Sequence, residues 1–198
     1  MPLETRELRS LFEFMRRQRR LSYIDRCNQI PKIKPYSVAE HSYFCAVYAM
    51  ILCDIVNNTR EKGKTIDVEE VLRRTLIHDH EESITGDILY PMHNEFPEFG
   101  EALEKVRNAV VDKQAFDGLP EGLVWMYQRL WRAAKDETDE GRMVVIVDKF
   151  EIVMFALQEM ELGNHSFRSI YVEAMSILRK EGRFPVIHDL LKVIERTF

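Results

Sequence analysis

Glycine, proline and cysteine are scarce in this chain of 198 residues, which has 8 Gly, 7 Pro and 3 Cys. So few turn-forming residues argue against an all-β fold with many tight turns, whereas 9 Met and abundant Leu, Glu, Lys and Arg favour helices. The cysteines Cys27, Cys45 and Cys53 are odd in number and form no CxxC pair. This pattern argues against a disulfide framework and a cysteine zinc site, so we expect buried free thiols.

An excess of positive charge is also missing, because 28 Lys and Arg face 33 Asp and Glu, for a net charge of −5. The chain therefore lacks the basic footprint of a protein that binds duplex nucleic acid. No uninterrupted apolar run is long enough to cross a bilayer, and the charged start MPLETRELRS does not resemble a signal peptide. We expect a soluble cytoplasmic protein that binds neither duplex nucleic acid nor a membrane.

Hydrophobic residues recur at helical spacing along the whole chain, and no convincing strand pattern exists. Ser37 with Glu40 forms a capping box, Asp67 is a second N-cap, and Gly86 is a helix stop. The predicted fold is a single all-α domain of about seven or eight helices. The predicted helices span about 4–20, 37–56, 67–85, 98–114, 120–135, 139–161, 165–181 and 185–197.

The string TLIHDHEESITGD at 75–87 changes from apolar to strongly polar within one predicted helix. His78 and Asp79 follow apolar residues directly, so we expect them near the core. On an ideal helix Asp79 lies at about 100° from His78, and Glu82 lies between them at about 40°. Glu81 falls outside that sector, at about 300°. A metal ion bound between His78 and Asp79 would therefore have Glu82, and not Glu81, as its next neighbour.

Two further residues complete a candidate metal site. His41 lies just inside the capped start of the helix predicted at 37–56, and Asp148 interrupts the apolar segment MVVIVDKFEIVMFAL. A lone carboxylate in such a helix is costly to bury unless it is paired or binds a cation. Two His and two Asp suit Mn, Co, Ni or Fe with water in open positions, and the lack of sulfur ligands argues against structural zinc. Singly, each residue also fits a surface histidine or a buried ion pair, but together they favour a metal site.

The order H…HD…D at His41, His78-Asp79 and Asp148 resembles the HD-domain metal-dependent phosphohydrolases. The strings SVAEHS (37–42) and HDHEESITGD (78–87), together with Pro91 and the helix from Asp148 to Asn164, resemble the 5′-deoxynucleotidase (YfbR-like) branch. This resemblance implies a single HD domain over 1–198, with a metal-site core at about 26–164. It also implies C-terminal helices at 165–198 that pack or make oligomer contacts, in a homodimer or higher homo-oligomer.

The resemblance further implies hydrolysis of a 2′-deoxynucleotide phosphate with one divalent transition metal ion. Co, Mn, Ni and Fe are the first candidates, and Mg and Zn are further ones. The implied metal ligands are His41, His78, Asp79 and Asp148, and Glu82 is the implied general acid/base. The favoured activity is that of a 5′-deoxynucleotidase, which releases phosphate from a deoxynucleoside monophosphate. The alternative is a dATP or other dNTP triphosphohydrolase, as in phage diaminopurine metabolism, and a remote alternative is a non-catalytic helical binding protein.

The same resemblance places several residues against the substrate. Arg26 stands where the family has a phosphate-binding Arg, and Asp87 stands where it has an Asp that contacts the sugar. Cys27 replaces a Trp that often follows the Arg, and His93 replaces a Lys two residues beyond Pro91. Lys34 would add positive charge at the mouth of the site. In a purely structural interpretation, Arg26 and Lys34 are solvated loop residues and Asp87 forms a turn.

Overall fold

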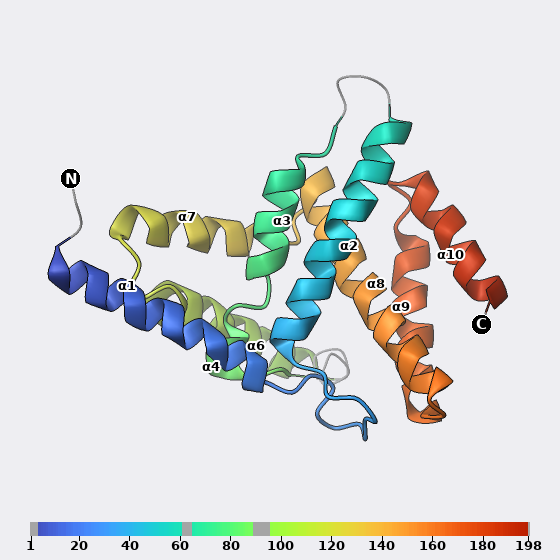
Figure 1. Ribbon diagram of the computed structural model, residues 1–198, viewed down its shortest axis with the longest axis horizontal. Coiled ribbons are helices and arrows are strands. Elements are labelled where there is room, and N and C mark those ends of the chain that lie inside the picture. The colour runs from blue at the N-terminus through green and yellow to red at the C-terminus, as the bar shows by residue number, and fades with distance from the viewer. Residues whose placement is uncertain (1–3, 61–64, 89–95, 198) are drawn as a thin grey trace.

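The computed structural model describes residues 4–60, 65–88 and 96–197 (Figure 1). Regular structure within these ranges is entirely helical, apart from one isolated antiparallel bridge between Asp25 and Ser37. The predicted all-α fold class is therefore confirmed. The helices are α1 (Thr5–Arg17), α2 (Val38–Thr59), α3 (Val68–Ile77), α4 (Glu82–Thr85), α6 (Pro97–Val110), α7 (Glu121–Arg132), α8 (Asp139–Glu161), α9 (Arg168–Lys180) and α10 (Pro185–Thr197).

Most predicted helix ends agree with the structure to within a few residues. The side chain of Ser37 accepts a hydrogen bond from the amide of Glu40, and Asp67 accepts one from Glu70, so both predicted N-caps are present. Short helical turns of another type replace the outer parts of three predicted helices, one of these turns being the 3-10 turn His165–Phe167 before α9. A 3-10 turn at Gln18–Tyr23 follows α1, and a π turn at Val111–Ala115 follows α6.

The helix predicted at 67–85 is wrong in one respect, because it breaks after Ile77. Residues 78–81 form a tighter turn, in which the amide of Glu82 bonds to the carbonyl of Asp79. The imidazole of His78 takes the carbonyl oxygen of Thr75, which a continuing helix would use for the amide of residue 79. After α4, Gly86 adopts φ = 75°, a conformation that glycine reaches without strain, so the predicted stop is confirmed.

The main core lies where α2 and α8 pack against each other (Figure 1). Helices α3 and α9 also pack on α8, and α10 packs on α9 and α2. A second, smaller cluster lies under α1, α6 and α7 and includes Phe14, Phe116 and Trp131. All three cysteines are buried and free, as expected. The polar turn at 78–81 lies between the two clusters, because α3 contacts both α8 and α7.

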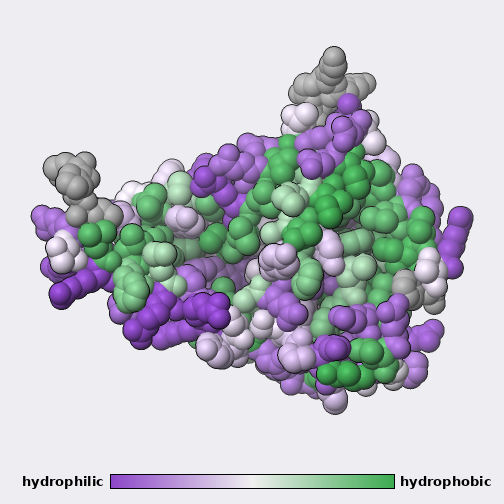
Figure 2. All heavy atoms as spheres, viewed as in Figure 1, coloured by the Kyte–Doolittle hydropathy of each residue, from purple (hydrophilic) through white to green (hydrophobic). Residues whose placement is uncertain are grey.

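Within the described residues, α2 is the one helix long and apolar enough to span a membrane by length and composition. One of its faces is buried in the main core, which is the pattern of a core helix in a folded domain. Its opposite face exposes large hydrophobic side chains, which Figure 2 shows as a hydrophobic area over α2. These residues are Tyr43, Phe44, Met50, Ile51 and Ile55.

The loop between the 3-10 turn at Gln18–Tyr23 and α2 is anchored by a buried carboxylate near the end of α8. Glu159 is 0% exposed and accepts hydrogen bonds from the amides of Ile33 and Lys34, both at 2.8 Å. Its Oε2 also accepts a bond from the Asn164 side chain, which itself donates to the carbonyl of Pro31. Burial raises the pKa of Glu159, but these hydrogen bonds together lower it by more. The net pKa therefore lies below the ordinary value of 4.5. This ionised side chain therefore fixes the loop that carries Arg26 and Cys27.

We predict that Glu159→Gln lowers the free energy of unfolding by about 1–3 kcal/mol, because an NH₂ group would face a backbone amide. The folded-state pKa of Glu159 is depressed, so its stabilising effect is complete above pH 4.5 and is lost as the pH falls through the folded-state pKa. Urea unfolding curves between pH 7 and pH 3 measure both effects. The difference in unfolding free energy between wild type and Glu159→Gln should become smaller as the pH falls.

Glu161→Gln is the matched control, because Glu161 is exposed on the same helix. It should change the unfolding free energy by less than about 0.5 kcal/mol. Equal stability of Glu159→Gln and wild type at pH 7 would contradict the anchoring role.

Candidate metal centre and substrate pocket

The four predicted metal ligands come from three separate elements and meet at one point. His41 lies in the first turn of α2, His78 and Asp79 lie in the turn after α3, and Asp148 lies in the middle of α8. Asp79 Oδ2 is 3.0 Å from His78 Nε2 and 3.6 Å from His41 Nε2. Asp148 Oδ1 is 3.4 Å from His41 Nε2. All four side chains are buried.

The imidazoles of His41 and His78 use Nδ1 for hydrogen bonds to the protein, which leaves Nε2 of each ring as the candidate metal ligand. His78 Nδ1 lies 2.6 Å from the carbonyl of Thr75, and His41 Nδ1 lies 2.6 Å from Glu151 Oε2. Both partners are acceptors, so a ring that is neutral, as a metal ligand must be, would carry its proton on Nδ1 and offer a lone pair on Nε2. His78 Nε2 has no hydrogen-bond partner although it faces the Asp79 carboxylate. Lone pairs that face carboxylates in a buried site fit a cation held between them.

Cations of the chain surround the two carboxylates. Lys135 Nζ lies 2.7 Å and Lys149 Nζ 3.3 Å from Asp148 Oδ2, and Arg26 Nη1 lies 2.8 Å from Asp79 Oδ2. Burial raises the pKa of Asp148, but Lys135 and Lys149 lower it, and the net pKa lies well below its ordinary value. The pKa of Asp79 is likewise well below its ordinary value, because His78, Lys135 and Arg26 outweigh its burial. Both carboxylates are therefore ionised and available as ligands.

Glu82 lines the same cavity as Asp79 and Asp148 and is the next candidate for a role in the chemistry. Its Oε2 is buried without such a partner and lies 3.7 Å from Arg26 Nη1. Burial and the charge of Asp79 raise the pKa of Glu82 well above its ordinary value, although Arg26 lowers it. A buried carboxyl group with a raised pKa can take up and release a proton near neutral pH.

Glu81 points away from the metal ligands, as the sequence geometry predicted. It is 0% exposed, its Oε1 accepts a bond from Arg107 Nε, and its Oε2 accepts one from the indole of Trp131. The predicted angles assumed an unbroken helix, which the turn at 78–81 is not. The two side chains nevertheless lie in different surroundings, because Glu82 lines the cavity and Glu81 bonds to Arg107 and Trp131.

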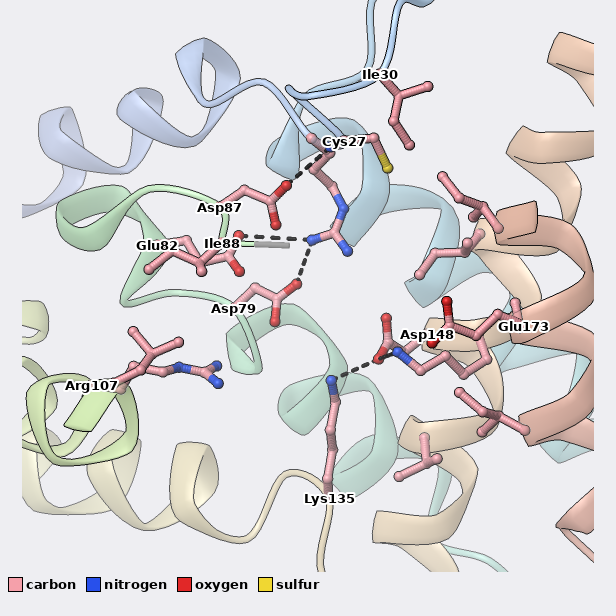
Figure 3. A pocket seen from close by; sticks show the side chains of 18 residues that line it. Cys27, Ile30, Asp79, Glu82, Asp87, Ile88, Arg107, Lys135, Asp148 and Glu173 are labelled. Atoms are coloured by element: carbon pink, nitrogen blue, oxygen red, sulfur yellow. Dashed lines mark hydrogen bonds and ion pairs between the residues drawn. The ribbon is translucent and has the colours of Figure 1, made fainter. Parts of the chain in front are cut away.

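A cavity of about 380 Å³ opens beside these residues (Figure 3). Charged side chains line one part of it, including Arg26, Asp79, Glu82, Arg107 and Asp148. Apolar side chains line another part, namely Ile30, Val145, Ile152, Ile170, Ala174 and Ile177. Helix α9 supplies several of these, so the site extends beyond the core predicted at 26–164. Helix α9 therefore lines the cavity as well as packing on α8, whereas α10 contributes no lining residue.

The predicted substrate residues have different positions in the structure. Arg26, Cys27 and Asp87 line the cavity, and Asp87 Oδ2 accepts a hydrogen bond from the Cys27 amide at 3.0 Å. Cys27 has φ = 51°, an uncommon conformation for a residue with a side chain, and the bond to Asp87 holds it there. Lys34 does not line the cavity. Its side chain is exposed, and its backbone amide donates a hydrogen bond to Glu159. His93 lies outside the described residues.

Sequence reasoning missed several residues that support the centre. Glu151 orients His41, and Tyr36 donates a hydrogen bond to the same carboxylate. Glu151 follows Asp148 by three residues, so helical spacing could have placed both on one face. Lys135 gave no such signal, since it lies in a charged turn between helices. Lys32 has a structural role, because its ammonium group bonds the carbonyls of Arg26 and Cys27 and the carboxylate of Asp25.

The chain is similar in sequence to curated relatives and in fold to solved structures. The chain is 24% identical to a 5′-deoxynucleotidase of Vibrio parahaemolyticus over 90% of each chain. It is 26% identical to the 5′-deoxynucleotidase YfbR of Escherichia coli, over 75% of this chain and 73% of that one. An HD-domain phosphohydrolase from Listeria innocua has a TM-score of 0.78 at 23% identity, and the match covers 94% of this chain and 87% of that chain.

A phage protein shares the fold at lower similarity. The cyanophage S-2L HD phosphohydrolase DatZ, solved with dA and one catalytic Zn²⁺ ion, has a TM-score of 0.61 at 19% identity, over 100% of this chain and 97% of that chain. The family described as 5′-deoxynucleotidase YfbR-like matches residues 13–197, which includes every helix that contributes to the cavity. The chain therefore belongs to the YfbR-like 5′-deoxynucleotidase family.

Proposed function

We propose that this protein is a divalent-metal-dependent 5′-deoxynucleotidase, which converts a 2′-deoxynucleoside 5′-monophosphate and water into a deoxynucleoside and phosphate. The observation that carries the proposal is that His41 and His78 contact Asp79 and Asp148, and that these two carboxylates, Glu82 and Arg26 line one cavity that also has an apolar wall. Membership of the family supports the same class of reaction.

The metal ligands in this proposal are His41 Nε2, His78 Nε2, Asp79 and Asp148. When bound, a divalent transition metal ion lowers the pKa of a coordinated water and offsets the charge of the phosphate. The mixed nitrogen and oxygen donors suit Mn, Co, Ni or Fe, whereas a structural zinc site is usually rich in sulfur donors. Glu151 keeps His41 in the tautomer that offers Nε2, and the Thr75 carbonyl does the same for His78.

Glu82 and Arg26 act on the reacting phosphate. Arg26 presents a buried guanidinium whose Nε has no hydrogen-bond partner, and such a group can hold phosphate oxygens. Water adds to phosphorus and the bond from phosphorus to the 5′ oxygen breaks. Glu82 accepts the proton that the water loses and returns one to the leaving 5′ oxygen. The products are inorganic phosphate and a neutral deoxynucleoside.

The rest of the cavity suits a nucleoside. Asp87 uses Oδ2 for the amide of Cys27, and its other oxygen can accept a hydrogen bond from a sugar hydroxyl. The apolar wall from α8 and α9 offers a surface for the base. Glu173 lies at the side of this wall (Figure 3). A nucleotide whose sugar contacts Asp87 and whose base lies on the apolar wall would have its phosphate beside the metal ligands.

The homo-oligomer implied by the resemblance stays a prediction. The exposed hydrophobic side chains along α2 form one described surface that suits a contact between subunits. They lie on the opposite side of α2 from the residues that face α8, so such a contact would leave the buried metal ligands in place.

We predict that Glu82→Gln lowers kcat by about 10²–10⁴-fold and leaves metal binding intact, because the amide cannot exchange the proton. Steady-state kinetics and metal content by mass spectrometry measure the two effects. The matched variant Glu81→Gln should keep kcat within a few-fold of wild type and lower the unfolding free energy by about 1–3 kcal/mol, because Glu81 has buried bonds to Arg107 and Trp131.

The reverse result would contradict the assignment. If Glu81→Gln abolished turnover and Glu82→Gln did not, Glu81 would be the acid/base group. Loss of the metal ion from Glu82→Gln would make Glu82 a ligand.

Product analysis separates the two candidate phosphatase activities. We expect the Mn- or Co-loaded protein to release inorganic phosphate from dAMP and to leave dATP intact, and chelation of the metal should abolish the reaction. Anion-exchange chromatography of the products is the measurement. Release of tripolyphosphate from dATP, with dAMP inert, would support the triphosphohydrolase alternative and contradict the proposal.

A further inference from the structure

A second guanidinium group, that of Arg107, reaches the cavity from α6. Figure 3 shows it directed from its helix toward the space between Asp79 and Lys135. Its side chain is 30% exposed, so the group is accessible from the cavity. Burial lowers the pKa of Arg107, but Glu81, followed by Asp79 and Glu82, raises it above its ordinary value, so Arg107 lies within electrostatic range of the candidate centre.

Arg107 is held from behind by the buried pair Glu81 and Trp131. Its Nε donates to Glu81 Oε1 at 2.6 Å, and its Nη2 contacts the same oxygen. The guanidinium carbon lies 5.7 Å from the centre of the Trp131 ring, while the indole of Trp131 bonds to Oε2 of Glu81. A fully buried carboxylate is costly, and here its bonds fix the orientation of one arginine.

This arrangement leaves one end of the guanidinium for a ligand. A guanidinium has five N–H donors in a planar fork. Glu81 engages Nε and Nη2, and the carboxylate of Glu104 is 4.0 Å from Nη1, which is too long for a hydrogen bond. Both N–H groups of Nη1 and the second N–H of Nη2 therefore remain, and one from each nitrogen can make a planar, two-point contact with a phosphate group.

Arg107 also differs from the other cavity cations in its ion partner. Arg26 pairs with Asp79, and Lys135 and Lys149 contact Asp148, so these three are close to the candidate metal ligands themselves. The main partner of Arg107 is Glu81, which does not line the cavity. A substrate phosphate can therefore approach Arg107 without displacing it from a metal ligand.

We propose that Arg107 binds the phosphate group of the substrate and of the product, and that Glu81 and Trp131 position it for this contact. The inference rests on the proposed function and adds a specificity-determining residue to it. Arg107 holds phosphate oxygens and exchanges no proton. It therefore sets KM and the inhibition constant of inorganic phosphate more than it sets kcat.

The main test is the double variant Glu81→Gln/Arg107→Gln, which removes both charges and leaves no unpaired buried carboxylate. The expected result is a rise of about ten-fold or more in KM for dAMP and in the inhibition constant of inorganic phosphate, with a smaller change in kcat. Thermal unfolding shows whether the variant is folded. Arg107→Lys is the second variant, since it keeps the charge near Glu81 and loses the planar fork, and it should raise both constants several-fold.

Arg129→Gln is the matched control. Arg129 is exposed on α7 and does not line the cavity, so this substitution removes one positive charge outside the cavity. It should leave KM and phosphate inhibition unchanged. If the folded Arg107 variants keep both constants within two-fold of wild type, or if Arg129→Gln changes them equally, the assignment of Arg107 is wrong.

Equilibrium dialysis with radiolabelled inorganic phosphate separates this inference from the proposed function. Weaker phosphate binding by the Arg107 variants supports the inference even if wild type hydrolyses no deoxynucleotide, in which case only the proposed function fails. Unchanged phosphate binding, with hydrolysis of dAMP intact, overturns only the inference.

Discussion

The structure depends on the burial of two ionised carboxylates, Asp79 and Asp148, at the place where three helical elements meet. Two such groups in a poorly solvated site would be strongly unfavourable unless positive charge surrounded them. The chain provides Arg26 from the loop before α2, Lys135 from the turn before α8, and Lys149 from α8 itself. Two imidazoles complete the group, with Nε2 atoms that lie 3.0–3.6 Å from the carboxylate oxygens. Most of the local architecture follows from this requirement, and a bound divalent cation would satisfy it most directly.

The same requirement explains how the elements are held. The loop that carries Arg26 is fixed from one side by Glu159 and from the other by Lys32. The turn that carries Asp79 is fixed because the His78 side chain takes a helical carbonyl and Glu81 is bonded beneath it. A site built in this way is ordered before substrate arrives, so little conformational entropy is lost when a phosphate binds. An acidic protein can therefore bind an anionic nucleotide through a few local cations and a metal ion.

Helical spacing and caps were enough to predict the all-α class, the long helices and the ends marked by Ser37, Asp67 and Gly86, because these signals are local. The break after Ile77 was not predictable, since it depends on a side-chain bond of His78 that competes with the helix. Lys34 was a reasonable candidate by charge, yet its loop turns the side chain outward. Arg107 could not be foreseen, because its position depends on how α6 packs, and tertiary packing is not visible in local spacing.

We predict that His41, His78, Asp79 and Asp148 together bind a single catalytic divalent ion. Anomalous diffraction from crystals of the Mn- or Co-loaded protein tests this claim most directly. The account predicts one strong peak at about 2.0–2.2 Å from the Nε2 atoms of both histidines and from a carboxylate oxygen of each aspartate. No peak at this position, or a peak on the other side of His41 between Cys45 and Glu151, would contradict it.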